Sequence, residues 1–241
     1  MSRYKLTIEY DGTDFFGWQI QPDARTVEGD LEKAIQQVLQ KDTDLVGQGR
    51  TDAGVHARSQ VAHIDLENAI DPEKFILSLN RLSNTDVHVK HIELVDDDFH
   101  ARFDAASRMY EYTLLKHPSP LHERYGVPVN RNCDVERMKE AAAVFIGDHD
   151  FAVLSKRNEE QLNTHCLVSV SEFEERDGVL IYRIKANRFL RNMVRRIIGS
   201  LLMIGEGKIT KKDLENLLDN QGDLPVKTAP AKGLCLVEVV Y

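Results

Sequence analysis

The spacing of apolar residues changes repeatedly along this 241-residue chain, between a period of two and a period of three to four. A period of two is typical of a strand with one buried face, and the longer period is typical of an amphipathic helix. Residues 4–10 follow the first pattern, and residues 27–39 follow the second. A chain that buries both kinds of element folds into packed layers of sheet and helix.

Strand, helix and strand patterns recur in both halves of the chain. In the first half the sequence predicts strands at 4–10, 59–64 and 87–95, and helices that open at Val27 and at Asp71-Pro72. In the second half it predicts strands at 110–115, 179–185 and 233–241, and helices that open at Asp134, at Arg188 and at the capping box Thr210–Asp213. We therefore predict a mixed α/β fold of the α+β class, with two similar α/β halves at residues 1–106 and 107–241 and largely antiparallel sheets.

The composition is that of an ordinary globular protein, with 42% hydrophobic and 29% charged residues. The longest nearly apolar run, residues 197–204, is too short to span a bilayer, and the N-terminus enters a strand pattern without a signal-peptide core. Three widely spaced cysteines indicate a reduced compartment rather than a disulfide framework or a zinc site. We predict a cytoplasmic protein with no membrane partner.

The formal net charge of −8 argues, taken alone, against a nucleic-acid partner. Six cations nevertheless occur between residues 183 and 196 with no acid among them: Arg183, Lys185, Arg188, Arg191, Arg195 and Arg196. On a helix that runs from Arg188 to Ile204, three of these arginines would share one face. Such a run is often a solvated face balanced by nearby acids. Because no acid interrupts it here, we favour phosphate binding.

Residues 49–58 combine two glycines, an acid, two arginines and a histidine between apolar elements. Asp52 is either a reactive carboxylate on a rigid turn or a turn residue that accepts backbone hydrogen bonds, and composition alone favours the second. His56 and His63 have no spacing typical of a metal site, so we predict no metal. The aromatic residues 15–19 are either core residues around a turn or an exposed loop that contacts unstacked bases.

Ordered motifs extend these observations along almost the whole chain. They are residues 9–12, 16–19, 49–56, 98–103, 110–112, 185–187, 193–195 and 233–234. In this order and spacing the chain resembles the tRNA pseudouridine synthase A family. The resemblance implies the pseudouridine synthase fold, with its two halves around a central cleft. It also implies an isomerase that detaches uracil from the ribose and rejoins it through C5, without cofactor or metal.

The resemblance assigns a role to several residues. Asp52 is the catalytic carboxylate, as a nucleophile or as a base at the ribose, and Arg195 is expected beside it, because a guanidinium favours the ionised form of a carboxylate. Tyr110 is expected to stack on uracil, which contributes roughly 1–3 kcal/mol per base. The remaining expected contacts to substrate or RNA are Arg50, which assists base flipping, Leu234 in the uracil pocket, and Arg58, Arg188 and Arg191.

The implied substrate is the anticodon stem-loop of tRNA, at positions 38 to 40, and the implied assembly is a homodimer. The chain departs from the family pattern at residues 155–168, where 163–167 contain no arginine. A non-catalytic RNA-binding or RNA-folding protein on the same fold is the alternative. A hydrolase that uses Asp52 would need a second carboxylate or a metal, and the sequence offers neither.

Overall fold

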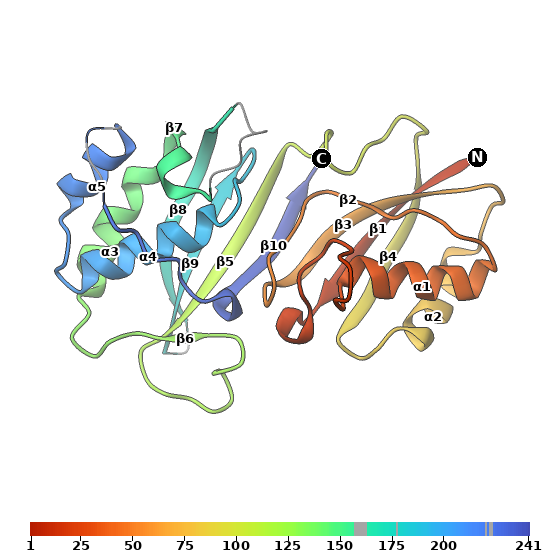
Figure 1. Ribbon diagram of the computed structural model, residues 1–241, viewed down its shortest axis with the longest axis horizontal. Helices are drawn as coiled ribbons and strands as arrows, with labels where there is room; N and C mark the ends of the chain where they lie inside the picture. The colour runs from red at the N-terminus through yellow and green to blue at the C-terminus, as the bar shows by residue number, and fades with distance from the viewer. Residues whose placement is uncertain (157–162, 177, 220, 222–223) are drawn as a thin grey trace. The chain divides into compact units, whose positions relative to one another are not determined.

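The computed structural model describes residues 1–156, 163–176, 178–219, 221 and 224–241. The chain forms two compact units, residues 1–106 with 235–241, and residues 107–234 (Figure 1). Each unit combines helices with a mostly antiparallel sheet, which confirms the predicted mixed fold class. The observed division differs from the predicted one at residues 235–241, which belong to the first unit. There Cys235 pairs with His56, and the Ala106 amide donates to the Val240 carbonyl at 2.7 Å.

The first unit is built on a sheet with helices against it. Strands follow the order β4 (Val87–Val95), β1 (Ser2–Tyr10), β3 (His56–Leu66) and β10 (Leu234–Val240), and β2 (Val46–Gly47) pairs with β3. The helical elements are η1 (Gly12–Asp14), α1 (Val27–Leu39) and α2 (Pro72–Leu82). Helix α2 packs on β4 and α1 lies beside α2 (Figure 1). Strand β1 is antiparallel to both of its neighbours.

Sequence periodicity accounts for the core of this unit. Alternate residues of β1 are buried, as the two-residue period predicts: Tyr4, Leu6, Ile8 and Tyr10. Helix α1 buries Leu31, Ala34 and Ile35 from one face. Helix α2 begins as predicted, with the Asp71 carboxylate accepting the Lys74 amide and Pro72 in the first turn.

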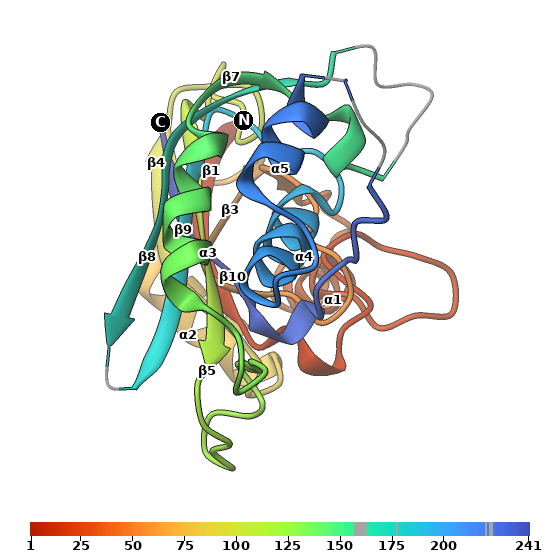
Figure 2. The same ribbon diagram turned by 90° about the vertical axis from the view of Figure 1, so that its left-hand side faces the viewer.

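The second unit also combines a sheet with helices, but its elements follow one another in a different order along the chain. Its strands follow the order β5 (Ser107–Leu115), β9 (Val179–Ala186), β8 (His165–Arg176) and β7 (Gly147–Asp150), and β6 (Val127–Pro128) pairs with β5. The helical elements are α3 (Val135–Ala142), η2 (Ala143–Phe145), η3 (Ala152–Leu154), α4 (Met193–Gly205), α5 (Lys211–Leu218) and η4 (Ala231–Gly233). Helix α3 packs on β8 and lies beside α4 (Figure 2).

The helix starts observed in this unit agree with the sequence prediction in most places. Asp134 caps α3, and the predicted capping box at Thr210 and Asp213 forms at the start of α5. Strand β8 was not among the predicted strands. A register shift between Val168 and Val170 interrupts its alternation, so the two-residue period is incomplete in the sequence.

Helix α4 begins later than the apolar spacing predicts. It starts at Met193, because Asn192 has a left-handed backbone with φ of 61° that regular helix does not allow. Arg188 and Arg191 therefore precede the helix, and the predicted helical face shared by Arg188, Arg191 and Arg195 is wrong. Leu190, in the same segment, is still buried, which explains why its spacing resembled that of a helix.

Among the residues that the structure describes, no helix combines the length and apolar character needed to cross a membrane.

His63 gives the first unit a pH-dependent stability. Its side chain is 4% exposed, and its Nδ1 accepts the Ala101 amide at 3.2 Å. Burial, followed by the charge of Arg3, lowers the pKa of His63 to about 4. The imidazole of His63 gains a proton below about pH 6.5 in the unfolded chain, but only near pH 4 in the folded chain. The contribution of His63 to the free energy of unfolding is therefore fully present above about pH 6.5 and is lost as the pH falls toward 4.

We expect His63 to account for a loss of up to about 3 kcal/mol in the free energy of unfolding between pH 6.5 and pH 4. Urea unfolding of the wild type and of His63→Gln at several pH values in this window measures it. The variant should lose less stability with falling pH, whatever its stability at pH 7. Equal pH slopes for the two proteins would contradict the assignment.

Candidate functional site

Asp52 lies in the loop between β2 and β3, and neighbouring backbone groups hold this loop on both sides. Before Asp52, the Trp18 amide donates to the Thr51 carbonyl at 3.2 Å, and the Tyr10 hydroxyl lies 2.8 Å from the Thr51 hydroxyl. After it, the Gly54 amide donates to the Phe15 carbonyl at 3.2 Å. The Asp52 carbonyl accepts the Val55 amide at 3.1 Å, so the loop also closes on itself. The half-buried Asp52 therefore sits on a rigid turn.

Two glycines allow the supporting segment to approach the loop closely. A Cβ on Gly12 would lie 2.0 Å from the Val55 carbonyl oxygen, and one on Gly17 would lie 2.5 Å from the Thr51 carbonyl oxygen. Gly17 also has φ of 98°, which disfavours any other residue. Residues 10–18, which we call the supporting segment, thus contact the loop at both of its ends.

The supporting segment decides between the two interpretations of the aromatic residues. Phe15 and Trp18 are each 2% exposed and belong to the core, whereas Phe16 is 62% exposed. The first interpretation therefore holds for Phe15 and Trp18. Phe16 alone among the three could contact a ligand.

Both histidines considered as metal ligands have structural partners instead. His56 is buried, and its Nδ1 lies 3.0 Å from the Gly12 amide and 3.1 Å from an Asp11 carboxylate oxygen. His63 accepts the Ala101 amide. Within the described part of the chain, no group of three or more His, Cys, Asp or Glu side chains is arranged to hold a metal ion.

Arg50 and Arg58 are exposed on either side of Asp52 in the sequence. Glu28 is a buried acid within electrostatic range of Arg50, and its carboxylate accepts the Ile20 amide at 2.8 Å. Burial raises the pKa of Glu28, and the hydrogen bonds from Ile20 and Trp18 and the charge of Arg50 oppose that shift. The positive charge of Arg50 thus has an acid near it, while its side chain remains open to solvent.

In the second unit, Arg195 and Tyr112 hold consecutive carbonyl groups of one segment. Arg195 Nε donates to the Ala229 carbonyl at 2.8 Å, and the Tyr112 hydroxyl donates to the Pro230 carbonyl at 2.7 Å. The Arg195 carbonyl also accepts the Ala229 amide at 3.0 Å. Leu234, 6% exposed, follows this segment directly after η4. Arg195 and the chain that leads to Leu234 are therefore fixed to each other.

Tyr110 is a half-buried residue of β5, paired with Ile184 of β9. Its ring meets the Phe189 ring edge to face, with centroids 5.1 Å apart. The contact restricts the orientation of the tyrosine ring. The structure thus places Asp52 in the first unit, and Tyr110, Arg195 and Leu234 in the second. That Asp52 meets Arg195 and Tyr110 in one site stays a prediction.

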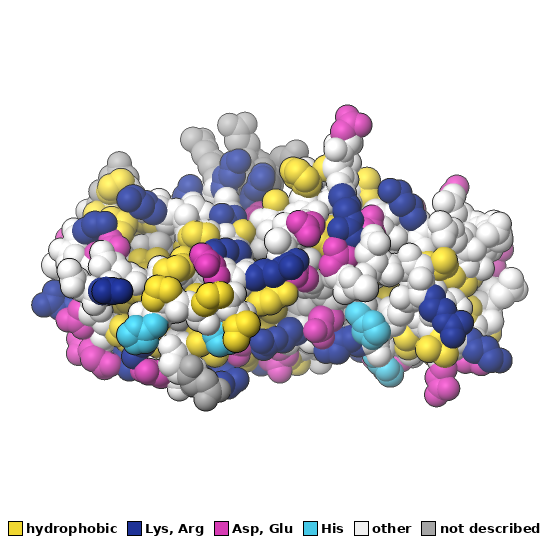
Figure 3. Space-filling model, turned by 90° about the horizontal axis from the view of Figure 1, so that it is seen from below, with side chains coloured by type: hydrophobic (Ala, Val, Ile, Leu, Met, Phe, Trp, Pro, Cys, Tyr) yellow, Lys and Arg dark blue, Asp and Glu magenta, His cyan; other side chains and the backbone are white. Residues whose placement is uncertain are grey.

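The basic run is less uniform than its sequence indicates. Arg183 pairs with Glu111 at 3.0 Å and with Glu174 at 2.5 Å, so acids from adjacent strands balance it. Arg196 donates to the Ser155 carbonyl at 2.6 Å. Arg188 is half-buried and Arg191 is exposed. On the face drawn in Figure 3, basic side chains are interspersed with acidic ones.

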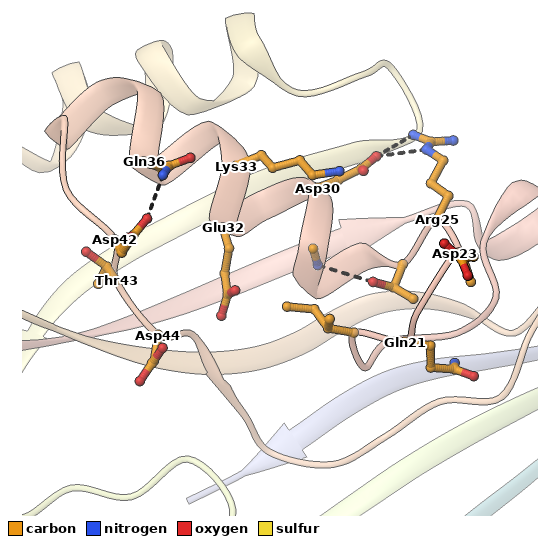
Figure 4. Close-up of a pocket in the computed structure, with 14 residues that line it drawn as sticks. Gln21, Asp23, Arg25, Asp30, Glu32, Lys33, Gln36, Asp42, Thr43 and Asp44 are labelled. Atoms are coloured by element: carbon orange, nitrogen blue, oxygen red, sulfur yellow. Dashed lines mark hydrogen bonds and ion pairs between the residues drawn. The ribbon is translucent and has the colours of Figure 1, made fainter.

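The sequence did not reveal an open acidic groove of about 720 Å³ along α1 (Figure 4). Five acids line it: Asp23, Asp30, Glu32, Asp42 and Asp44. Burial, reinforced by the charges of Glu28 and Asp44, raises the pKa of Glu32. In the sequence, the groove is marked only by the polar face of α1 and by the acids at positions 42 and 44. Such residues are also typical of ordinary solvated surface, so they did not predict a groove.

Comparison with known proteins gives one family model and several relatives that match most or all of the chain. A family model described as tRNA pseudouridine synthase matches residues 6–104 and 141–241. The tRNA pseudouridine synthase A of Chlorobium limicola is 40% identical over 243 residues, which cover 100% of both chains. That of Bacteroides thetaiotaomicron is 40% identical over 245 residues, covering 100% of this chain and 91% of the relative.

Among solved structures, the chain matches one titled "Crystal Structure of a Cbf5-Nop10-Gar1 Complex" at 13% identity. The match covers 82% of this chain and 54% of the other, with a TM-score of 0.33. A similarity at this level is too low to indicate a shared arrangement by itself.

The close approach at Gly17 predicts a large effect of a single methyl group. We expect Gly17→Ala to lower the free energy of unfolding by about 1–3 kcal/mol, because the added Cβ would overlap the Thr51 carbonyl and the backbone conformation would be strained. Gly49→Ala is the matched control, since a Cβ there would have no atom within 4 Å. Urea unfolding measures both variants. Equal, small effects would show that the two segments are not in tight contact.

Proposed function

The chain belongs to the tRNA pseudouridine synthase family, and we propose that Asp52 is the carboxylate with which it isomerises uridine to pseudouridine in tRNA. The observation that carries this proposal is the support of the loop around Asp52. Hydrogen bonds at Thr51 and Gly54 hold the turn from both sides. A preorganised reacting group contributes to catalysis because little has to be reordered in the transition state.

The reaction breaks the bond between ribose C1′ and uracil N1 and forms a bond between C1′ and uracil C5. The hydrogen that leaves C5 is balanced by the one that N1 gains, so no atom is added and no electron is exchanged. Asp52 acts either as a nucleophile toward the ribose or as the base that removes a ribose proton. Both routes begin from the ionised carboxylate.

Residues of the second unit complete the proposed site. Tyr110 stacks on the uracil, and its edge contact with Phe189 supports a fixed ring orientation. Arg195 pairs with Asp52 and favours its ionised form, and its hydrogen bond to Ala229 supports a defined position for the guanidinium. Leu234 lines the uracil pocket, next to the segment that Arg195 holds.

The RNA contacts belong to the proposal as well. Arg50 assists extrusion of the target nucleotide, and Arg58, Arg188 and Arg191 contact the RNA backbone. The exposure of Arg50, Arg58 and Arg191 supports such contacts. The proposed target is the anticodon stem-loop at positions 38 to 40.

We further propose a homodimer in which one subunit anchors the tRNA while the other modifies it. The 39 acidic residues of a single chain outnumber its 31 Lys and Arg residues, and a dimer would combine two sets of arginines on one RNA. Three cysteines without disulfide bonds support a cytoplasmic location.

The decisive test of the proposed function is Asp52→Asn, which keeps the shape of the side chain and removes its charge. With tRNA that lacks the modification, we expect kcat to fall at least about 1,000-fold while the Kd for tRNA changes less than about threefold. Pseudouridine mapping of the tRNA measures turnover. Retained turnover in the variant would exclude Asp52, and a wild type that leaves uridine unchanged would favour the RNA-binding alternative.

Arg191 tests the proposed RNA contacts. Arg191→Ala should weaken tRNA binding and make the slope of log K against log salt shallower by about one unit, because one phosphate contact and its released counterion are lost. Arg137→Ala removes a similarly exposed arginine, on α3, and should leave the slope unchanged. Filter binding over a range of salt concentrations measures both. An unaltered slope for Arg191→Ala removes this residue from the interface.

A further inference from the structure

The guanidinium of Arg25 is held by the carboxylates of two aspartates. Its Nε donates to Asp30 at 2.8 Å, and its two terminal nitrogens donate to the two Asp86 carboxylate oxygens at 2.7 and 2.9 Å. Figure 4 shows the Arg25 side chain directed toward Asp30 at the start of α1. Both edges of the guanidinium are therefore occupied by carboxylates, and its position is determined by a rigid fork geometry.

The face of the same guanidinium covers Phe15. The Arg25 Cζ lies 4.1 Å from the centroid of the Phe15 ring, and Phe15 is 2% exposed. Phe15 is also the residue whose carbonyl accepts the Gly54 amide, two residues after Asp52. A continuous set of contacts thus runs from Arg25 through Phe15 to the loop that carries Asp52.

The partner carboxylate connects a further part of the supporting segment. The Asp86 side chain binds Arg25, and the Asp86 carbonyl accepts the Asp11 amide at 2.9 Å. Asp11 caps η1, which leads directly to Phe15. The Arg25–Asp86 pair therefore holds both the ring of Phe15 and the turn of chain that precedes it.

We propose that Arg25 is a positioning residue for Asp52, which acts through Phe15 and the Gly54 amide and does not contact the substrate. The inference rests on the proposed function, because it concerns the placement of the proposed catalytic carboxylate. A displacement of about 1 Å of a reacting group can cost about 100-fold in rate. A loss of the planar guanidinium should therefore lower kcat and leave tRNA binding nearly unchanged.

The variant Arg25→Lys tests whether the planar guanidinium of Arg25, rather than its positive charge, positions the Asp52 loop. Lysine keeps the positive charge but offers neither the bidentate fork nor the flat face that covers Phe15. We expect kcat to fall about 10- to 100-fold and the KM for tRNA to change less than about threefold. Amide hydrogen exchange at Gly54 should be at least about tenfold faster, because its acceptor on Phe15 is no longer fixed.

Arg3→Lys is the matched control. Arg3 forms a similar bidentate pair with Asp65, at 2.7 and 2.6 Å, and donates to the Phe99 carbonyl at 2.8 Å. It lies in the same unit, on β1, and it is no part of the proposed site. Its replacement should lower stability to a similar extent, while kcat and the exchange of the Gly54 amide remain those of the wild type.

The outcomes distinguish this inference from the function on which it rests. An inactive wild type or a fully active Asp52→Asn variant overturns the proposed function itself. If both behave as expected, wild-type kcat in Arg25→Lys overturns the positioning role. So does a rise in KM alone, which would make Arg25 an RNA contact, and so does an equal loss of kcat in Arg3→Lys, which would make the effect general destabilisation.

Discussion

The contact between the supporting segment and the Asp52 loop is the constraint on which the rest of the candidate site depends. Residues 10–18 reach the loop with backbone groups, and the closest approaches occur where Gly12 and Gly17 have no side chain. Backbone hydrogen bonds to Thr51 and Gly54 then define the turn without involving the Asp52 carboxylate. The chain thus holds an acid on a turn whose backbone is fixed from both sides.

The second unit uses the same strategy with different groups. Arg195 and Tyr112 hold neighbouring carbonyls at Ala229 and Pro230, so that a segment without regular structure receives its hydrogen bonds from an α-helix and a β-strand. Burial raises the pKa of the Tyr112 hydroxyl far above its ordinary value, so it remains a neutral donor. In the first unit, residues 10–18 thus fix the loop that carries Asp52, and in the second unit a helix and a strand fix the segment that leads to Leu234.

The net charge of −8 does not describe the surroundings of individual arginines. Several arginines serve the fold: Arg25 binds two aspartates, and Arg183 binds two glutamates. Other arginines, such as Arg50 and Arg191, are exposed and are among those proposed for RNA. Since screening limits the effect of distant acids to roughly 8 Å at physiological salt, an acidic protein can still bind a polyanion through such local cations.

The sequence by itself determined most elements and the family. Apolar periods and caps located β1, α1, α2, β4 and α5, because those signals are local and need no partner. Ordered motifs identified Asp52, Tyr110 and Arg195 as candidates, although their meeting in one site stays a prediction. Only the tertiary structure showed that α4 begins at Met193, that the closing strand joins the first unit, and that Arg25 covers Phe15. The reason is physical: each of these depends on contacts between residues far apart in the chain or on a single backbone angle, and neither leaves a periodic trace in the sequence.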